Sequence, residues 1–254
     1  MSRRIELAYA PSLGEAGLLN LYLPDGEEAC PLYLYLHGGG LESGSKDGDE
    51  GMATRLAGSG IAVATMNYRL YPHARFPEFV EDCAAAAAYL KEHGGEYRRF
   101  SRFTIGGSSA GGYLSMMLCF DRHYLLQHGI DPDGVDAYLF DAGQPTTHFN
   151  VLRERGLDSR LVRVDEAAPL FFVDGDVDPN RKPPMLFIVS DHDMENRLEQ
   201  TALMRRTLLH FGYAPERVRL QVMTGFAHCG YLNDDRYYDL VVPFLKGEEA
   251  AGQP

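Results

Sequence analysis

The absences in this sequence already exclude several kinds of protein. No run of about 18 consecutive apolar residues occurs among its 254 residues, so we expect no membrane-spanning helix. The two arginines near the start are not followed by an apolar stretch, which is unlike a signal peptide. Lys and Arg total 24 against 36 Asp and Glu, and the formal net charge of −12, with no basic stripe, argues against a nucleic-acid partner.

Cysteine is scarce and scattered. The four cysteines have no CxxC spacing and no common sequence context. They are Cys30, Cys83, Cys119 and Cys229. Buried free thiols in a reducing compartment are the simplest interpretation, and we therefore predict a cytoplasmic protein.

Short apolar runs alternate with helical stretches along the chain, which is typical of an α/β fold. We expect strands at 5–8, 18–23, 32–36, 61–66, 103–105, 137–140, 183–190 and 218–223. We expect helices at 49–57, 79–90, 110–120, 198–211 and 234–245. Strands separated by helices should pair in parallel, and the first two strands should pair antiparallel at one edge. The expected architecture is a single domain over 1–254, with a mostly parallel twisted sheet flanked by helices and residues 142–182 inserted as a small cap or an ordered loop.

A nucleophile motif lies between one expected strand and the next helix. Gly107-Ser108-Ser109-Ala110-Gly111 fits G-x-S-x-G, in which a sharp strand-to-helix turn exposes the serine oxygen and small neighbours let the two arms approach. The motif makes Ser109 the candidate nucleophile. Ser108 is the alternative nucleophile, but a G-x-S-x-G pattern centred on Ser108 would have Ala110 in place of the second glycine.

Three consecutive glycines follow another buried strand in His37-Gly38-Gly39-Gly40. Such a run is entropically costly, and its use here would be to direct bare N–H groups at a developing oxyanion. We expect the N–H groups of Gly39 and Gly40 in this role, together with that of Ala110, the residue after the nucleophile. His37 is expected to be structural, with its ring bonded to nearby backbone.

These motifs resemble those of the hormone-sensitive-lipase-like esterases and their small bacterial relatives in the α/β-hydrolase superfamily. The resemblance rests on HGGG at 37–40, the segment 67–72, and GSSAGG at 107–112, in this order and spacing. It implies an α/β-hydrolase fold over about residues 30 to 245. The chain differs from many relatives in carrying Ser108 before the nucleophile and Leu41 after HGGG, and we expect no bulky N-terminal cap.

In this fold the acid and then the histidine follow the nucleophile along the chain. The family pattern Gly-x-x-Asp matches 190–193 with Ser190 in the glycine position, so Asp193 is the expected acid. Asp191 is the alternative and Glu195 a third candidate. His228 is the expected base, because it lies in a glycine-flanked segment after the last expected strand. With Ser109, Asp193 and His228 as a triad, we expect no metal and no organic cofactor.

Four residues are predicted to line a substrate pocket, because they flank the nucleophile motifs or follow a strand end on the ligand side of the sheet. They are Leu41, Ser108, Gln144 and His148. The predicted function is a serine carboxylesterase acting on short-chain acyl or acetyl esters. The expected binding partner is a small-molecule ester substrate, and the chain could form a homodimer. The alternatives are an aryl formamidase-like amidase, a prolyl-oligopeptidase-like peptidase and a non-catalytic binding protein on the same fold.

Overall fold

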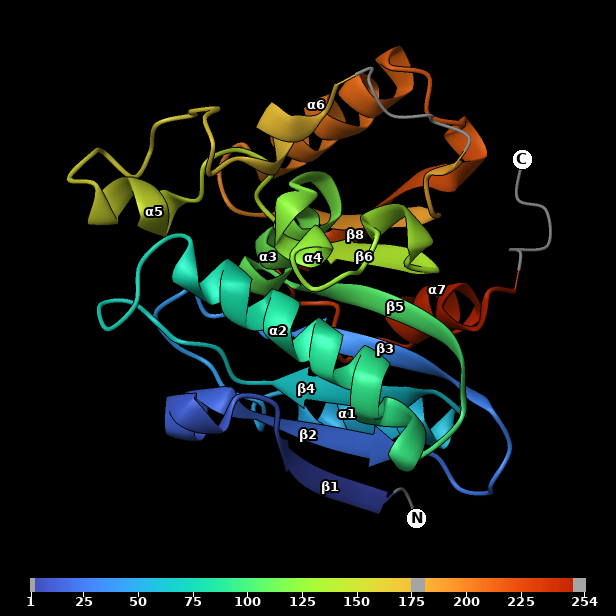
Figure 1. The fold of residues 1–254 in the computed structure, drawn as a ribbon. Coiled ribbons are helices and arrows are strands. Elements are labelled where there is room, and N and C mark those ends of the chain that lie inside the picture. Colours follow the sequence, from blue (N-terminus) through green and yellow to red (C-terminus); the bar gives the residue numbers. More distant parts are fainter. Residues whose placement is uncertain (1–2, 175–180, 249–254) are drawn as a thin grey trace.

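One sheet of eight strands forms the centre of the molecule (Figure 1). The computed structural model describes residues 3–174 and 181–248. The strands are β1 (Arg3–Ala8), β2 (Leu18–Leu23), β3 (Cys30–Leu36), β4 (Ala62–Met66), β5 (Phe100–Ser108), β6 (Ala137–Asp141), β7 (Met185–His192) and β8 (Val218–Ala227). Their order across the sheet is β1-β2-β4-β3-β5-β6-β7-β8.

The strand directions confirm the expected mixed sheet. β1 pairs antiparallel with β2, and β2 pairs antiparallel with β4. Every pair from β4 to β8 is parallel. The carboxyl ends of these parallel strands therefore meet at one edge of the sheet, which is where α/β proteins bind ligands.

Helices cover both faces of the sheet, as the alternating leucines and tyrosines of β3 require. Leu32, Leu34 and Leu36 belong to a core cluster that includes residues of α2, α3 and α6. Tyr33 and Tyr35 point to the opposite face and join a second cluster with residues of α1 and α7. The helices are α1 (Glu50–Gly58), α2 (Glu78–His93), α3 (Ala110–Phe120), α4 (His123–Leu126), α5 (Phe149–Glu154), α6 (Arg197–His210) and α7 (Asp235–Lys246).

Strand β5 is longer than the predicted 103–105, because its glycines belong to the strand and not to a loop. A Cβ on Gly106 would lie 2.4 Å from the carbonyl oxygen of Leu139 on the neighbouring strand. The missing side chain therefore permits close pairing of β5 with β6 up to the nucleophile motif.

The described part of the predicted insertion, residues 142–174, contains helix α5 and the short 3-10 helix η4 (Pro169–Phe172). Helix α5 contacts the HGGG segment: Asn150 Nδ2 donates to the Gly40 carbonyl at 2.7 Å, and Arg153 pairs with Glu42. Residues 175–180 of the predicted insertion lie outside the described part. Among the described residues, no helix combines the length and the apolar character needed to cross a membrane.

Candidate active site

Ser109 occupies the sharp turn between β5 and α3. Its backbone has φ 56° and ψ −113°, a conformation that non-glycine residues rarely adopt. A Cβ on Gly107 or Gly111 would lie 2.3 or 1.8 Å from the Leu36 carbonyl oxygen. The glycines of the motif are therefore required by close backbone contact between β5, α3 and β3.

Two side chains from other strand ends form a hydrogen-bonded chain with Ser109. His228 directly follows β8, and its Nε2 lies 2.8 Å from Ser109 Oγ. Asp193 directly follows β7, and its Oδ1 lies 2.6 Å from His228 Nδ1. The three candidates from the sequence are thus brought together at the carboxyl edge of the parallel strands, in the arrangement that nucleophilic catalysis needs.

The surroundings of Asp193 favour its charged form. Burial acts to raise the pKa of this carboxyl, but the hydrogen bond and charge of His228 and the N–H of Met194 at 2.7 Å outweigh burial and hold the pKa below its usual range. Ser190 Oγ also donates to Asp193, at 2.9 Å. Asp191 instead accepts the N–H of Gly225 at 2.8 Å, so it does not face the imidazole.

The third candidate for the acid, Glu195, lies away from this chain of hydrogen bonds. Its side chain is exposed and makes no hydrogen bond to His228 within the described residues. No group of three or more His, Cys, Asp or Glu side chains in residues 3–174 and 181–248 is arranged to hold a metal ion.

The HGGG segment lies against the nucleophile. A Cβ on Gly38 would be 3.3 Å from Ser109 Cβ. Gly39 and Gly40 both have positive φ, 112° and 66°, and within the described chain their N–H groups donate to no protein acceptor. Ala110 is the first residue of α3, where an N–H has no partner inside the helix. These N–H groups are therefore free to bind an anion beside Ser109.

His37 is bonded to backbone, as expected. Its Nδ1 lies 2.6 Å from the Gly38 carbonyl oxygen, and its ring stacks on Tyr68 with centroids 4.2 Å apart. Burial lowers the pKa of His37 to about 4. The neutral ring consequently donates through Nδ1 and stiffens the start of the HGGG segment.

One cavity contains the candidate nucleophile and base, and a second includes Met194, the residue after Asp193. One, of about 360 Å³, contains Ser109, His228 and Ser108 together with Tyr35 and Asp49. The other, of about 370 Å³, lies between the insertion and the loop after β7. Its wall includes Gln144, Phe149, Leu161, Val162 and Met194. Asp49 and Tyr35 were missed in the sequence, since nothing in their local pattern separates them from an acidic loop and a core strand.

Two of the four predicted pocket residues are buried away from both cavities. Leu41 is fully buried in the core, because its backbone has φ 66° and the side chain packs inward. His148 is also buried, and its Nδ1 accepts the N–H of Asn150 at 3.2 Å as the N-cap of α5. Neither side chain lines the two cavities, whereas Ser108 and Gln144 each line one.

A buried carboxyl group lies directly behind the nucleophile turn. Asp141 ends β6, its carbonyl accepts the N–H of Ser109 at 2.8 Å, and Tyr231 donates to its Oδ1. Burial raises the pKa of Asp141 to about 7; the Tyr231 hydrogen bond opposes this shift, and the charge of Asp193 adds to it. Hydrophobic residues precede Asp141 in its strand, so the sequence offered no signal for this group.

The fold and the site together define an α/β-hydrolase with a Ser-His-Asp arrangement at the strand ends. The chain belongs to the prolyl oligopeptidase family, whose model matches residues 77–247. A second family model, BD-FAE, matches residues 19–133. These matches and the curated relatives below confirm the resemblance to α/β-hydrolase esterases of the hormone-sensitive-lipase-like group.

Curated relatives carry esterase names. The chain is 36% identical over 97 residues to "Esterase LipI" of Mycobacterium tuberculosis, covering 37% of this chain and 30% of the relative. It is 35% identical over 98 residues to "Acetyl esterase" of Salmonella enteritidis, covering 38% of this chain and 30% of the relative. The chain thus spans about 30% of the length of these curated relatives.

Solved structures match over nearly the whole chain. A "truncated form of carbohydrate esterase from gut microbiota" has a TM-score of 0.81 at 20% identity and covers 98% of this chain and 96% of that one. The Est2 esterase of Thermogutta terrifontis has a TM-score of 0.75 at 20% identity, with the same coverage of 98% and 96%. At this identity the likeness establishes the shared fold.

Proposed function

We propose that this protein is a serine carboxylesterase that hydrolyses short-chain acyl or acetyl esters through an acyl-enzyme intermediate. The observation that carries the proposal is the continuous hydrogen-bonded chain from Ser109 Oγ through His228 to Asp193 at a strained strand-to-helix turn. The esterase names of the curated relatives support an ester as the substrate.

The roles follow from this geometry. His228 Nε2 takes the proton of Ser109 as Oγ attacks the acyl carbon, and the imidazolium then protonates the leaving alcohol. Asp193 fixes the tautomer of His228 and stabilises the imidazolium without becoming protonated. A water molecule, activated by His228 in the same way, attacks the acyl-enzyme and releases the acid.

We assign the oxyanion hole to the N–H groups of Gly39, Gly40 and Ala110. Donors of this kind stabilise the tetrahedral intermediates of acyl transfer, and the loss of a single one in a well-studied protease slows catalysis by about 10²–10³-fold. The hydrogen bond from Asn150 to the Gly40 carbonyl supports the assignment, because it fixes the orientation of this peptide segment.

We assign the acyl group to the cavity beside the insertion. Its wall combines the apolar side chains of Phe149, Leu161, Val162 and Met194 with polar and charged residues, which are Gln144, Ser159, Arg160, Glu195, Asn196, Arg197 and Gln200. The apolar part of the wall suits a short alkyl chain, and Gln144 is itself held by a hydrogen bond to the Thr147 carbonyl at 2.9 Å.

The test is hydrolysis of p-nitrophenyl esters from acetate to decanoate by the wild type, Ser109→Ala and Ser108→Ala. We expect turnover of the short esters, loss of that turnover in Ser109→Ala and retained turnover in Ser108→Ala. A folded wild type that is inert on the whole series would refute the esterase proposal.

Amide hydrolysis is the second candidate, because the chain belongs to the prolyl oligopeptidase family. The same triad can attack an amide, and the two substrates differ in how strongly the leaving group must be protonated. Matched acyl p-nitroanilides measured beside the esters distinguish the two: a higher kcat/KM on the anilides would make the protein an amidase or a peptidase.

We also propose that the chain forms a single domain, with the described part of the insertion as an ordered cap over the HGGG segment. One sheet with strands from Arg3 to Ala227 supports this. The four free cysteines support a cytoplasmic location. A homodimer remains a prediction for light scattering to test.

A further inference from the structure

A second carboxylate lies in the cavity beside Ser109. Asp49 directly precedes α1, a position from which an aspartate commonly accepts a hydrogen bond from the first helical turn. Here its side chain makes no such bond, and it lines the cavity that contains Ser109 and His228. Tyr35 donates to the Asp49 carboxylate, while burial raises the pKa of this group above its usual range. The carboxylate therefore faces the site and does not cap its helix.

The Asp49 carboxylate has no cationic partner among the described residues. In residues 3–174 and 181–248, no Lys or Arg forms an ion pair with Asp49. The lysine nearest in sequence, Lys46, has its Nζ 2.9 Å from Glu6 and 3.1 Å from Asp47. A half-buried carboxylate with one hydroxyl partner keeps unused acceptor capacity, which a ligand in the cavity can fill.

Other hydrogen-bonding groups share the cavity wall with the apolar side chain of Leu232. Ser43 and Ser45 contribute hydroxyl groups, and Gly39, Gly44 and Gly48 contribute exposed backbone. The volume of about 360 Å³ lies in the range of small-molecule sites, roughly 300–1,000 Å³. A ligand part that enters here meets hydrogen-bonding groups on several sides.

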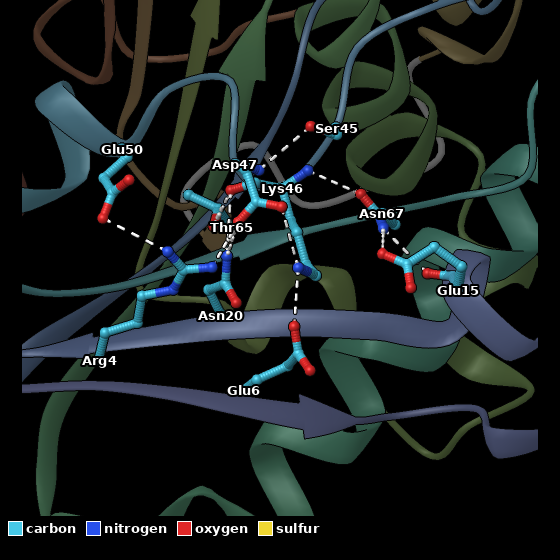
Figure 2. Close-up of polar contacts among 10 residues, drawn as sticks. All are labelled: Arg4, Glu6, Glu15, Asn20, Ser45, Lys46, Asp47, Glu50, Thr65 and Asn67. Atoms are coloured by element: carbon cyan, nitrogen blue, oxygen red, sulfur yellow. Dashed lines mark hydrogen bonds and ion pairs between the residues drawn. The ribbon is translucent and has the colours of Figure 1, made fainter.

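The segment that carries this wall is held in place by buried hydrogen bonds (Figure 2). The N–H of Lys46 donates to Asn67 Oδ1 at 2.7 Å, and its carbonyl accepts from Thr65 Oγ1 at 2.7 Å. Ser43 connects the same segment to the HGGG turn, since its N–H and Oγ donate to the Gly39 carbonyl at 3.1 and 3.0 Å. Asp49 is thus presented on a preorganised wall, which reduces the entropic cost of binding.

We propose that this cavity receives the alcohol part of the ester, and that Asp49 accepts a hydrogen bond from a hydroxyl group on that alcohol. Esters of hydroxyl-bearing alcohols are then preferred over esters of plain alkyl alcohols. The inference rests on the proposed hydrolase activity at Ser109 and adds the class of alcohol to it.

The test compares kcat/KM for glycerol 1-monoacetate and for propyl acetate in the wild type and three variants. Asp49→Ala should lower the ratio of the glycerol ester to the propyl ester by about tenfold or more, as expected for loss of a hydrogen bond to a charged group. Asp49→Asn should lower the ratio less, because its amide oxygen still accepts. Glu50→Gln is the matched control, because Glu50 is exposed and lies outside the cavity wall. This substitution removes the same charge as Asp49→Asn, and the ratio should stay at the wild-type value.

Two results overturn the role of Asp49. One is a ratio that does not change in Asp49→Ala and Asp49→Asn while both unfold at the wild-type temperature. The other uses acetylcholine as a third substrate. If both variants impair only the hydrolysis of acetylcholine, the Asp49 carboxylate selects a cation and not a hydroxyl group. Failure of the hydrolase proposal looks different, since the folded wild type would then hydrolyse none of the three esters.

Discussion

The substitution Asp141→Asn tests the electrostatics of the buried carboxyl group behind the nucleophile turn. Asn has nearly the same shape as Asp, and its amide oxygen can still accept from Tyr231. Its NH2 group replaces Oδ2, which has no hydrogen-bond partner among the described residues. The variant therefore removes the ionisation and leaves one buried donor unpaired.

The size of the pH effect on the free energy of unfolding follows from two pKa values of Asp141. Its pKa is about 7 in the folded protein and about 3.9 for an unperturbed aspartate. Because the folded state holds the proton more tightly, the contribution of Asp141 to stability is fully present below pH 4. It is lost as the pH rises through about 7 and does not change above that. Roughly three pKa units correspond to about 4 kcal/mol. The unpaired NH2 group of the variant costs about 1–3 kcal/mol at every pH.

We therefore expect the stability curves of the two proteins to cross. Asp141→Asn should be the less stable protein at pH 4.5 and the more stable one at pH 8.5, as measured by urea unfolding at constant ionic strength. Asp239→Asn, on the exposed face of α7, removes a carboxyl without burial and serves as the control. Parallel curves for the wild type and Asp141→Asn between these pH values would show that the buried carboxyl does not titrate as reasoned.

Two further predictions concern the acid of the triad and the glycines of the turn. Asp193→Asn should lower kcat/KM on the order of 10⁴-fold, because the amide favours the wrong imidazole tautomer. Asp191→Asn, in the same segment, should keep most of the activity. A larger loss of kcat/KM in Asp191→Asn than in Asp193→Asn would make Asp191 the acid of the triad. Gly111→Ala should destabilise the protein by about 3 kcal/mol or more, since its Cβ would lie 1.8 Å from a backbone carbonyl oxygen. Gly51→Ala, in α1 with no atom within 4 Å, should stabilise it by about 0.5–1 kcal/mol in the same urea titration.

The arrangement of strands could be predicted because burial leaves a strong pattern in the sequence. Strands covered on both faces are apolar throughout, and the intervening helices impose parallel pairing. The ends of β5, β7 and β8 could not be placed in this way, because they continue into polar or glycine-rich residues that resemble loops. Gly106 illustrates the reason: it is in the strand because the neighbouring backbone leaves no room for a side chain.

The predicted triad residues were accessible to sequence analysis for a similar reason. The turn at Ser109 tolerates only small neighbours, and the order of nucleophile, acid and base follows from the order of the strands. The predicted pocket was less accessible, because the direction of a side chain in a loop depends on backbone angles that the sequence does not reveal. Leu41 follows HGGG, but its positive φ turns it into the core.

Asp49 and Asp141 were missed because a carboxylate gains its role from its surroundings. Asp49 lies between Asp47 and Glu50, the first residue of α1, and its place in the cavity distinguishes it from these exposed neighbours. Asp141 closes an apolar strand, where an acidic residue would be expected to reach solvent. Both side chains are buried or half-buried and lack a cationic partner among the described residues, and this follows only from the folded chain.

The charges of Asp49 and Asp193 both act on Asp141, so three carboxyl groups lie near one another in a chain whose net charge is −12. The negative field of these groups is weakly screened in a partly buried site. The same field repels an ester that carries its own carboxylate. We therefore expect the electrostatics to favour a neutral ester over an anionic one, in agreement with the hydroxyl-bearing alcohol that we propose as the ligand of Asp49.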